Sequence, residues 1–301
     1  MTIAPILVTG ATGNVGREVV RTLCNAGQPV RALVTDPEAA ARHADEQTKL
    51  LVTFARFDFA DPSTHETAFM GATSMFLMRP PAIADASVIN AAVDNALQAG
   101  VRQVVFLSIQ GAAHNPIVPH HAIEAHLQQV ALTEPTFAYT FLRAAFFMQN
   151  LSSTHAADIR EFDDVFVPAG HGRTAFVDAR DVGAAAARVL QSHDADAFKN
   201  TAFELTGSEA LTYDEVAAML TRALGRPIGY SHPSVFSFYR RMRKRGYSRT
   251  FIAVMIALYT TSRVGMADHL SPELAQLLGR DAILFAAFAN DYVAEWKAKT
   301  V

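Results

Sequence analysis

Residues 6–17 read ILVTGATGNVGR, and this stretch decides the fold. The run Ile6–Thr9 has the apolar and β-branched residues of a buried strand, and a helix pattern begins soon after the glycines that follow it. A strand that enters a helix through such a loop brings unpaired helix N–H groups against a diphosphate. Gly10 would make the tight turn, Gly13 would remove a Cβ that blocks the phosphates, and Gly16 would let helix and strand pack closely. The stretch therefore predicts a dinucleotide-binding site.

Strand-like runs recur along the first half of the chain, with helical stretches between them. The runs lie at residues 6–9, 30–34, 51–57, 74–77, 104–107 and 138–142. Such alternation predicts βαβ units and a parallel sheet, and hence an α/β fold. The pairs Asp36-Pro37 and Asp61-Pro62 predict two helix starts, because aspartate caps a helix and proline suits its first turn.

Beyond about residue 150 the strict alternation ends. Short strands are expected at residues 165–168, 174–177 and 202–205, and helices at 181–191, 212–224 and from 234 onward. A chain of 301 residues is long enough for one large domain and a smaller partner. We expect a nucleotide-binding domain over 1–150 and a smaller mixed α/β lobe over 151–301, with part of 174–191 returning to the first domain.

The composition is that of an ordinary globular protein, with 50% hydrophobic and 18% charged residues. A net charge of −3 gives no global attraction to phosphate polymers or anionic membranes, so neither nucleic acid nor membrane is an expected partner. The single cysteine, Cys24, excludes an internal disulfide and a cysteine-based metal cluster. The most apolar window, 251–259, is shorter than the about 20 residues that span a bilayer. Because a strand is expected from Ile6 onward, there is no space for a signal segment before it, and we expect a cytoplasmic protein.

Seven ordered segments of the chain resemble the NmrA-like branch of the atypical short-chain dehydrogenases/reductases. They are the glycine loop at 10–16, DFADP (58–62), FLSIQGA (106–112), PHHAIEAHL (119–127), TFLRAAFFMQNL (140–151), FVDARDVGAAAARVL (176–190) and FELTGSEALTYDEVA (203–217). The resemblance covers most of the chain. It implies a Rossmann domain with a doubly wound parallel sheet, a small C-terminal substrate lobe and a bound nicotinamide dinucleotide.

The resemblance also assigns residues to the cofactor. The residues that it implies around the pyrophosphate are Gly10, Thr12, Gly13, Asn14, Val15 and Gly16. Asp58 and Phe59 would flank the adenine, and Met78 and Arg79 would border the ribose and the nicotinamide. Core packing of Phe59 and Met78 stays open, as does a turn or cap role for Asp58.

The choice between NADP and NAD depends on the end of the second expected strand. A carboxylate there binds the adenosine ribose, whereas an arginine accepts a 2′-phosphate. Asp36 could bind the ribose, but it is equally explained as a helix cap. Thr35 stands where an NADP-preferring site often has arginine, and Arg17 and Arg31 are near in sequence. Both cofactors stay open, with NADP slightly favoured.

The chain lacks the Tyr-x-x-x-Lys pair that short-chain dehydrogenases use for proton transfer. In the region of that pair stand His120 and Glu124, which share one helix face at i, i+4 spacing. We hypothesise that His120 donates a proton to a reduced carbonyl or quinone oxygen and that Glu124 orients it. Ser108 or Gln110 would hydrogen-bond the substrate. In the alternative, His120 merely begins a helix and Glu124 lies in solvent.

Residues 239–249, YRRMRKRGYSR, carry six Lys or Arg. Such a run favours a solvated helix face, and contact with an anionic partner stays open. Asp178 and Asp181 are three residues apart without a dense group of other ligands, so we expect helix capping there and no metal site.

Two functions are consistent with these features. The first is an NAD(P)H-dependent oxidoreductase that reduces a small apolar carbonyl, quinone or related acceptor. The second is a non-catalytic NAD(P)-binding regulator that senses redox state and acts on a partner protein. The missing Tyr/Lys pair favours the regulator, whereas the second lobe and the aromatic residues at 141–148 favour the enzyme. We expect a reductase with a small-molecule substrate, and a homodimer or a regulatory protein partner stays open.

Overall fold

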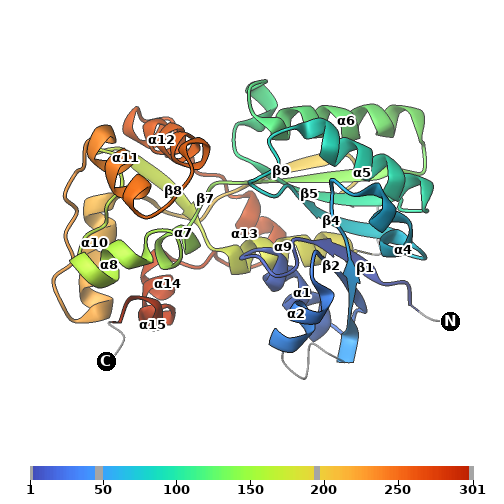
Figure 1. The fold of residues 1–301 in the computed structure, drawn as a ribbon, viewed down its shortest axis with the longest axis horizontal. Helices are drawn as coiled ribbons and strands as arrows, with labels where there is room; N and C mark the ends of the chain where they lie inside the picture. The colour runs from blue at the N-terminus through green and yellow to red at the C-terminus, as the bar shows by residue number, and fades with distance from the viewer. Residues whose placement is uncertain (1–2, 45–49, 193–196, 298–301) are drawn as a thin grey trace. The chain divides into compact units, whose positions relative to one another are not determined.

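A computed structural model describes residues 3–44, 50–192 and 197–297 of the chain (Figure 1). By their internal contacts the residues form two units. The first comprises Met1–Ala144, Ala179–Leu205 and Gln276–Gly279, and the second comprises Ala145–Asp178, Thr206–Ala275 and Arg280–Val301. The first unit thus includes residues 179–205, which is a longer segment than the part of 174–191 expected to return to it.

The first unit is built on a seven-stranded parallel sheet in the order β3-β2-β1-β4-β5-β6-β9. Its strands are β1 (Ile6–Thr9), β2 (Val30–Val34), β3 (Val52–Arg56), β4 (Ser74–Met78), β5 (Gln103–Ile109), β6 (Ala138–Ala144) and β9 (Thr201–Leu205). All four residues of β1 are buried, as expected for a strand covered on both faces. The strand order reverses between β1 and β4, which confirms the expected doubly wound sheet.

Helices cover both faces of this sheet (Figure 1). They are α1 (Gly16–Asn25), α2 (Pro37–His43), α4 (His65–Phe69), α5 (Ala86–Gln98), α6 (Pro119–Thr133) and α9 (Ala179–Leu190), with 3₁₀ turns at Pro62–Thr64 and Ala112–His114. Helices α1 and α9 pack together on one face, while α5 packs against α4 and α6 on the other. A Cβ on Gly183 would lie 2.6 Å from the Glu18 Cβ, so glycine allows α9 to approach α1 closely.

The second unit contains a mixed three-stranded sheet in the order β10-β8-β7. Strand β8 (Arg173–Val177) pairs in parallel with β7 (Phe146–Phe147) and antiparallel with β10 (Ala210–Thr212). The other elements are α7 (Gln149–Ser152), α8 (Ala156–Phe162), α10 (Tyr213–Leu224), α11 (Val235–Lys244), α12 (Arg249–Arg263), α14 (Phe285–Asp291) and α15 (Val293–Trp296). Helix α13 (Glu273–Leu278) is divided, with residues 273–275 in this unit and residues 276–278 in the first. Its core is rich in aromatic rings, and the buried Trp296 donates its indole N–H to the Leu151 carbonyl at 2.8 Å.

Several local expectations are confirmed and others are wrong. Asp36 caps α2, because its side chain accepts the Ala39 N–H at 2.9 Å. Residues 165–168 form no strand, and only an isolated bridge between Asp164 and Gly229 lies beside them. Residues 202–205 were expected in the second lobe, but they lie in β9 of the large sheet, since β6 offers them a parallel partner. A short apolar run specifies neither its partner nor, by itself, a strand.

The apolar window 251–259 lies within α12, where Ile252, Met255 and Tyr259 are buried and Val254 and Leu258 are exposed. Among the described residues, no helix has both the length and the apolar character needed to traverse a bilayer.

Candidate active site

The loop between β1 and α1 has a backbone that only glycine allows. Gly10 has a φ of +59°, and its carbonyl accepts the Gly13 N–H at 2.9 Å. A Cβ on Gly16 would lie 2.1 Å from the Gly10 carbonyl oxygen, far inside van der Waals contact. A Cβ on Gly10 would lie 2.2 Å from the Met78 sulfur. Gly16 is therefore required for the close approach of α1 to the loop, and Gly10 chiefly for its left-handed backbone.

Helix α1 begins without a side-chain cap. Val15 stands at its N-cap position, where its apolar side chain cannot accept a hydrogen bond, whereas the Asp36 side chain caps α2. The Arg17 N–H donates to the Gly13 carbonyl at 3.0 Å, and the Glu18 and Val19 N–H groups donate to the Val15 carbonyl at 2.9 and 3.0 Å. The N–H groups that precede Arg17 lie at the positive end of the helix dipole. Thr12 and Asn14, which precede the helix, are exposed. An open glycine loop before an uncapped helix fits the diphosphate of a dinucleotide.

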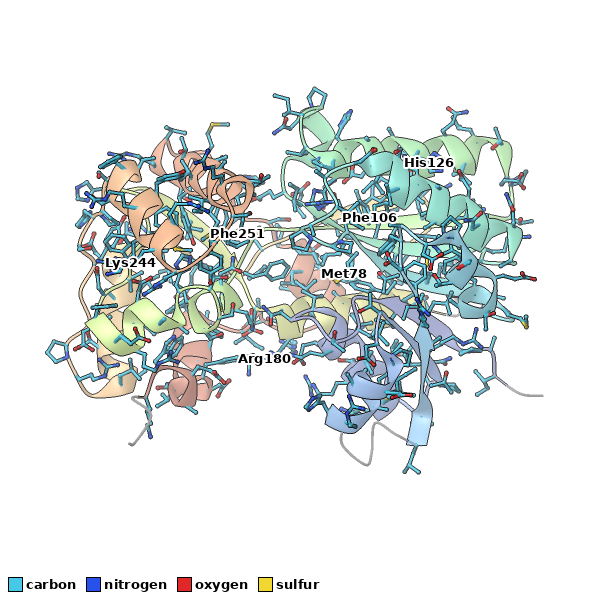
Figure 2. The ribbon with its side chains drawn as sticks, in the orientation of Figure 1. Met78, Phe106, His126, Arg180, Lys244 and Phe251 are labelled. Carbon is cyan, nitrogen blue, oxygen red and sulfur yellow. The ribbon has the colours of Figure 1, made fainter. Side chains whose placement is uncertain are left out.

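Thr9 joins the loop to the neighbouring strand. Its hydroxyl oxygen accepts the Met78 N–H at 2.8 Å, and its O–H lies 3.2 Å from the Phe76 carbonyl oxygen, to which it donates. These bonds place Met78, labelled in Figure 2, at the carboxyl end of β4 beside the glycine loop. In doubly wound sheets, ligands bind outside the carboxyl ends of the strands where the order reverses, as it does between β1 and β4.

Arg79 and His120 each hold a buried nitrogen without a hydrogen-bond partner, Nε of Arg79 and Nδ1 of His120. The Arg79 Nη1 donates to two nearby carbonyls, at 3.1 and 2.5 Å, and burial lowers the pKa of Arg79. The His120 ring stacks on Phe106, with ring centroids 5.9 Å apart. Burial, and then the Arg79 cation, lower the pKa of His120 to about 4. Buried polar atoms without a partner are rare in proteins, and a bound water or ligand is one of the groups that can satisfy them.

Glu124 is not placed as the sequence suggests. Its buried carboxylate accepts the Ser108 hydroxyl at 2.6 Å and two Arg143 N–H groups, from Nε at 3.0 Å and Nη2 at 2.7 Å. The hydrogen bond to Glu124 is the largest of the causes that raise the pKa of Arg143. The Glu204 carboxylate also lies 3.5 Å from Arg143 Nη1. Both oxygens of Glu124 are thus held, and the expectation that this carboxylate orients His120 is wrong. So is the alternative that it lies in solvent.

Arg143, the partner of Glu124, is not among the residues predicted from the sequence. It stands in the apolar strand segment TFLRAAFF, where a charged side chain requires a partner. The charged residue in an apolar strand segment therefore indicates the need for a partner. The sequence does not identify which residue that partner is.

Asp58 and Phe59 lie where their alternative readings put them. The Asp58 carboxylate accepts the Ala60 N–H at 2.9 Å within a turn, and its carbonyl accepts from Nε2 of the buried His65 at 2.8 Å. Phe59 is buried, with its ring edge-on to Phe57 at 4.7 Å. Neither contact tests a role beside the adenine.

The residues near the end of β2 leave the cofactor choice open. Thr35 is exposed, and the Asp36 side chain caps α2. Arg31 donates to two carbonyl oxygens at the end of α4, so its guanidinium is engaged there. Arg17 is half exposed and lies 3.7 Å from Glu18. Gln110, at the end of β5, donates its backbone N–H to the Ala144 carbonyl at 3.0 Å.

Two other expectations concern charged residues of later segments. Helix α9 begins at Ala179, so Asp181 lies inside its first turn and is not the N-cap; Asp178 accepts from the Gln149 amide at 2.8 Å. In the basic run, Arg241 and Arg245 bind the buried Asp158, so this run is only partly a solvated face.

The model of the NmrA-like family matches residues 3–266. This chain belongs to the NmrA-like family. The resemblance drawn from the seven segments is thereby confirmed. An NAD(P)H azoreductase of Xenophilus azovorans is 33% identical to this chain over 294 residues, which cover 97% of this chain and 99% of the relative.

Two further proteins are similar over nearly the whole NmrA-like chain. Quinone oxidoreductase 2 of Escherichia coli (strain K12) is 26% identical over 288 residues, which cover 93% of this chain and 96% of that protein. Among solved structures, the triphenylmethane reductase of Citrobacter sp. complexed with NADP(H) superposes with a TM-score of 0.79 and 24% identity, covering 97% and 99% of the two chains.

Proposed function

We propose that this chain is an NAD(P)H-dependent oxidoreductase that reduces a small, flat acceptor of the quinone or azo class. The observation that carries the proposal is the glycine loop before the uncapped start of α1, beside Arg79 and His120 with their unpartnered buried nitrogens. The azoreductase relative supports the same chemistry at 33% identity over 97% of this chain.

In this function the backbone N–H groups at the start of α1 bind the diphosphate, and Met78 and Arg79 border the nicotinamide side. The bound cofactor supplies a hydride. The task of the protein is then to hold the acceptor close and correctly oriented, which needs no dedicated acid when the acceptor is a quinone.

His120 acts in this proposal as a neutral hydrogen-bond donor. With a pKa of about 4, only about one imidazole in a thousand is protonated at pH 7. The imidazolium is therefore too scarce at pH 7 to be the main proton source, whereas the N–H of the neutral ring can hold an oxygen or nitrogen of the acceptor. The proton that completes the reduction would come from water.

Ser108 does not suit the substrate contact that its position suggests. A serine hydroxyl has one proton, and the Ser108 hydroxyl is hydrogen-bonded to the Glu124 carboxylate, which can only accept. Gln110 stays the proposed side chain for hydrogen-bonding the acceptor. Ser108, Glu124 and Arg143 would instead hold the strand ends rigid around it.

The test is oxidation of NADPH and of NADH by purified protein with azo dyes, quinones and aldehydes, next to calorimetric titration of each nucleotide. We expect turnover with at least one azo or quinone acceptor. In His120→Ala, kcat/KM should fall about tenfold while nucleotide affinity is retained, which is the effect of one lost hydrogen bond. The matched control is His43→Ala, an exposed histidine at the end of α2. Equal rates for His120→Ala and wild type across pH would contradict the role of His120.

A regulator that binds NAD(P) without turnover is the second candidate. It is favoured by the absence of the Tyr-x-x-x-Lys pair and by the engagement of Glu124, on the helix where that pair would stand, with Ser108 and Arg143. Tight nucleotide binding without oxidation by any acceptor would support this candidate over the reductase.

A further inference from the structure

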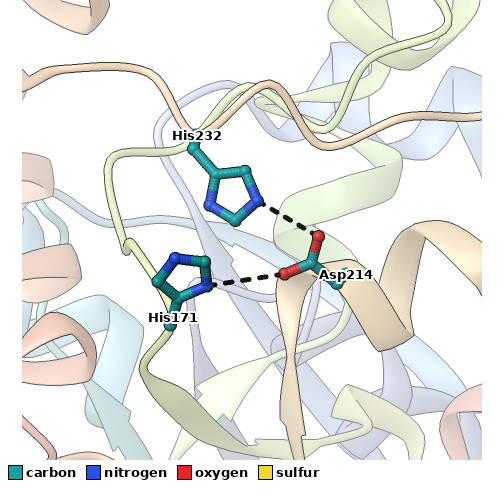
Figure 3. A group of neighbouring side chains, drawn as sticks. All are labelled: His171, Asp214 and His232. Atoms are coloured by element: carbon teal, nitrogen blue, oxygen red, sulfur yellow. Dashed lines mark hydrogen bonds and ion pairs between the residues drawn. The ribbon is translucent and has the colours of Figure 1, made fainter.

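Three potential metal ligands come together on the surface of the second unit (Figure 3). His171 lies in the turn before β8, Asp214 in the first turn of α10, and His232 between α10 and α11. One ligand atom from each residue lies within 4.8 Å of the other two. The three residues are far apart along the chain, so no local motif indicates this group.

The Asp214 carboxylate stands between the two imidazoles and offers a different oxygen to each (Figure 3). His232 Nε2 lies 3.1 Å from one oxygen, and His171 Nδ1 lies 4.0 Å from the other. The two rings have centroids 4.6 Å apart.

His232 is held in place from its other side. Its ring packs on Tyr230 at 4.1 Å, and the Tyr230 hydroxyl donates to the Val167 carbonyl at 3.0 Å. Two of the three ligands therefore have defined positions: Asp214 in a helix and His232 on a ring anchored to the core.

Two imidazole nitrogens and one carboxylate oxygen are a ligand set typical of zinc, with a fourth position for water. In a tetrahedral site with bonds of about 2.0–2.1 Å, ligand atoms lie about 3.3 Å apart. The present spacing needs a closure on the order of 1 Å. His171 can supply that movement, because its side chain is 89% exposed and can change rotamer without repacking a core.

We propose that His171, Asp214 and His232 form a zinc site that ties the turn before β8 and the segment after α10 to the start of α10. The proposal is independent of the reductase function, since all three ligands belong to the second unit and none is a proposed cofactor or substrate residue. Its expected consequence is a more stable second unit when zinc is bound.

The test uses full-length protein without an affinity tag, treated with chelator and titrated with Zn²⁺ by calorimetry. We expect one ion per chain with a dissociation constant on the order of 1 μM and a higher melting temperature with zinc. Co²⁺ in place of Zn²⁺ should give visible absorption bands of a four-coordinate site. Mg²⁺ should not bind, because it prefers oxygen ligands.

The deciding variants are His171→Ala, His232→Ala and Asp214→Asn, with circular dichroism to verify folding. Each should weaken zinc binding at least about tenfold and abolish the cobalt bands, in line with the loss of one direct ligand. His43→Ala, an exposed histidine of the first unit, should bind like wild type. The proposal is overturned if wild type binds no zinc at 100-fold excess over the expected dissociation constant, or if the His171→Ala/His232→Ala variant binds it equally well.

Discussion

Position 16 has no room for a methyl group, because its Cβ would lie 2.1 Å from a backbone oxygen and 2.6 Å from a backbone carbon of Gly10. Neither atom can move without deforming the loop that binds the diphosphate in the proposed function. The nearby Gly10 differs in this respect, since the atom that its Cβ would meet belongs to the flexible Met78 side chain. Its requirement for glycine comes chiefly from its φ of +59°.

Gly16→Ala is accordingly expected to weaken nucleotide binding at least about tenfold and to lower the free energy of unfolding by about 1–3 kcal/mol, as overpacking does. Calorimetric titration with NADPH and urea denaturation measure the two effects. The control is Gly229→Ala, because a Cβ there meets its nearest atom at an ordinary 3.9 Å. Unchanged affinity in Gly16→Ala would mean that the loop does not hold the nucleotide.

At the scale of elements, the basic helix α11 has two different faces. Arg245 donates to both oxygens of the buried Asp158 in α8, at 2.6 and 2.8 Å, and Arg241 adds a third bond at 2.9 Å. Burial raises the pKa of Asp158, although both arginines act in the opposite direction. Lys244, labelled in Figure 2, is exposed at the end of the same helix. Part of the positive charge of the run therefore serves to join α11 to α8.

We expect Arg245→Met to lower the free energy of unfolding by about 2–3 kcal/mol, because it leaves a buried carboxylate with fewer partners. Lys244→Met should change it by less than about 0.5 kcal/mol. Urea denaturation at neutral pH compares the two. Equal effects would show that the ion pairs of Asp158 add nothing beyond surface charge.

For the molecule as a whole, acid sensitivity is expected from a histidine in the core of the second unit. His155 is fully buried, and its Nε2 lies 2.6 Å from the Tyr259 hydroxyl, while its Nδ1 has no partner. Burial, and then the Arg245 cation, lower the pKa of His155 to about 3. Its value in the unfolded chain is about 6.5.

Between pH 6.5 and pH 3 the unfolded chain therefore binds one proton more than the folded chain at His155. The free energy of unfolding is then expected to rise with pH in this window and to fall on acidification. His155 contributes up to about 1.4 kcal/mol per pH unit to this change. Denaturation of wild type and His155→Gln at pH 7.5 and pH 5 measures it. The loss on acidification should be smaller in His155→Gln; an equal loss would assign it to other groups, His120 included.

Features that depend on neighbouring residues could be predicted from the sequence alone. The glycine loop, the buried strands β1 and β2, the proline-marked start of α2 and the NmrA-like order of segments are all local patterns, and each is present in the structure or confirmed by the family match. Backbone conformation and alternating burial depend on a few successive residues, so short sequence patterns predict them.

Contacts between distant groups depend on how the whole chain packs. The tertiary structure places residues 202–205 in the large sheet and brings His171, Asp214 and His232 together. It also makes Arg143 and Ser108, and not His120, the hydrogen-bond partners of Glu124. A charged residue in an apolar strand indicates that its side chain needs a partner, but any complementary group in the chain could be that partner. The partner is selected by the packing of the whole core, because close-packed side chains leave a single arrangement in which the buried polar groups are satisfied.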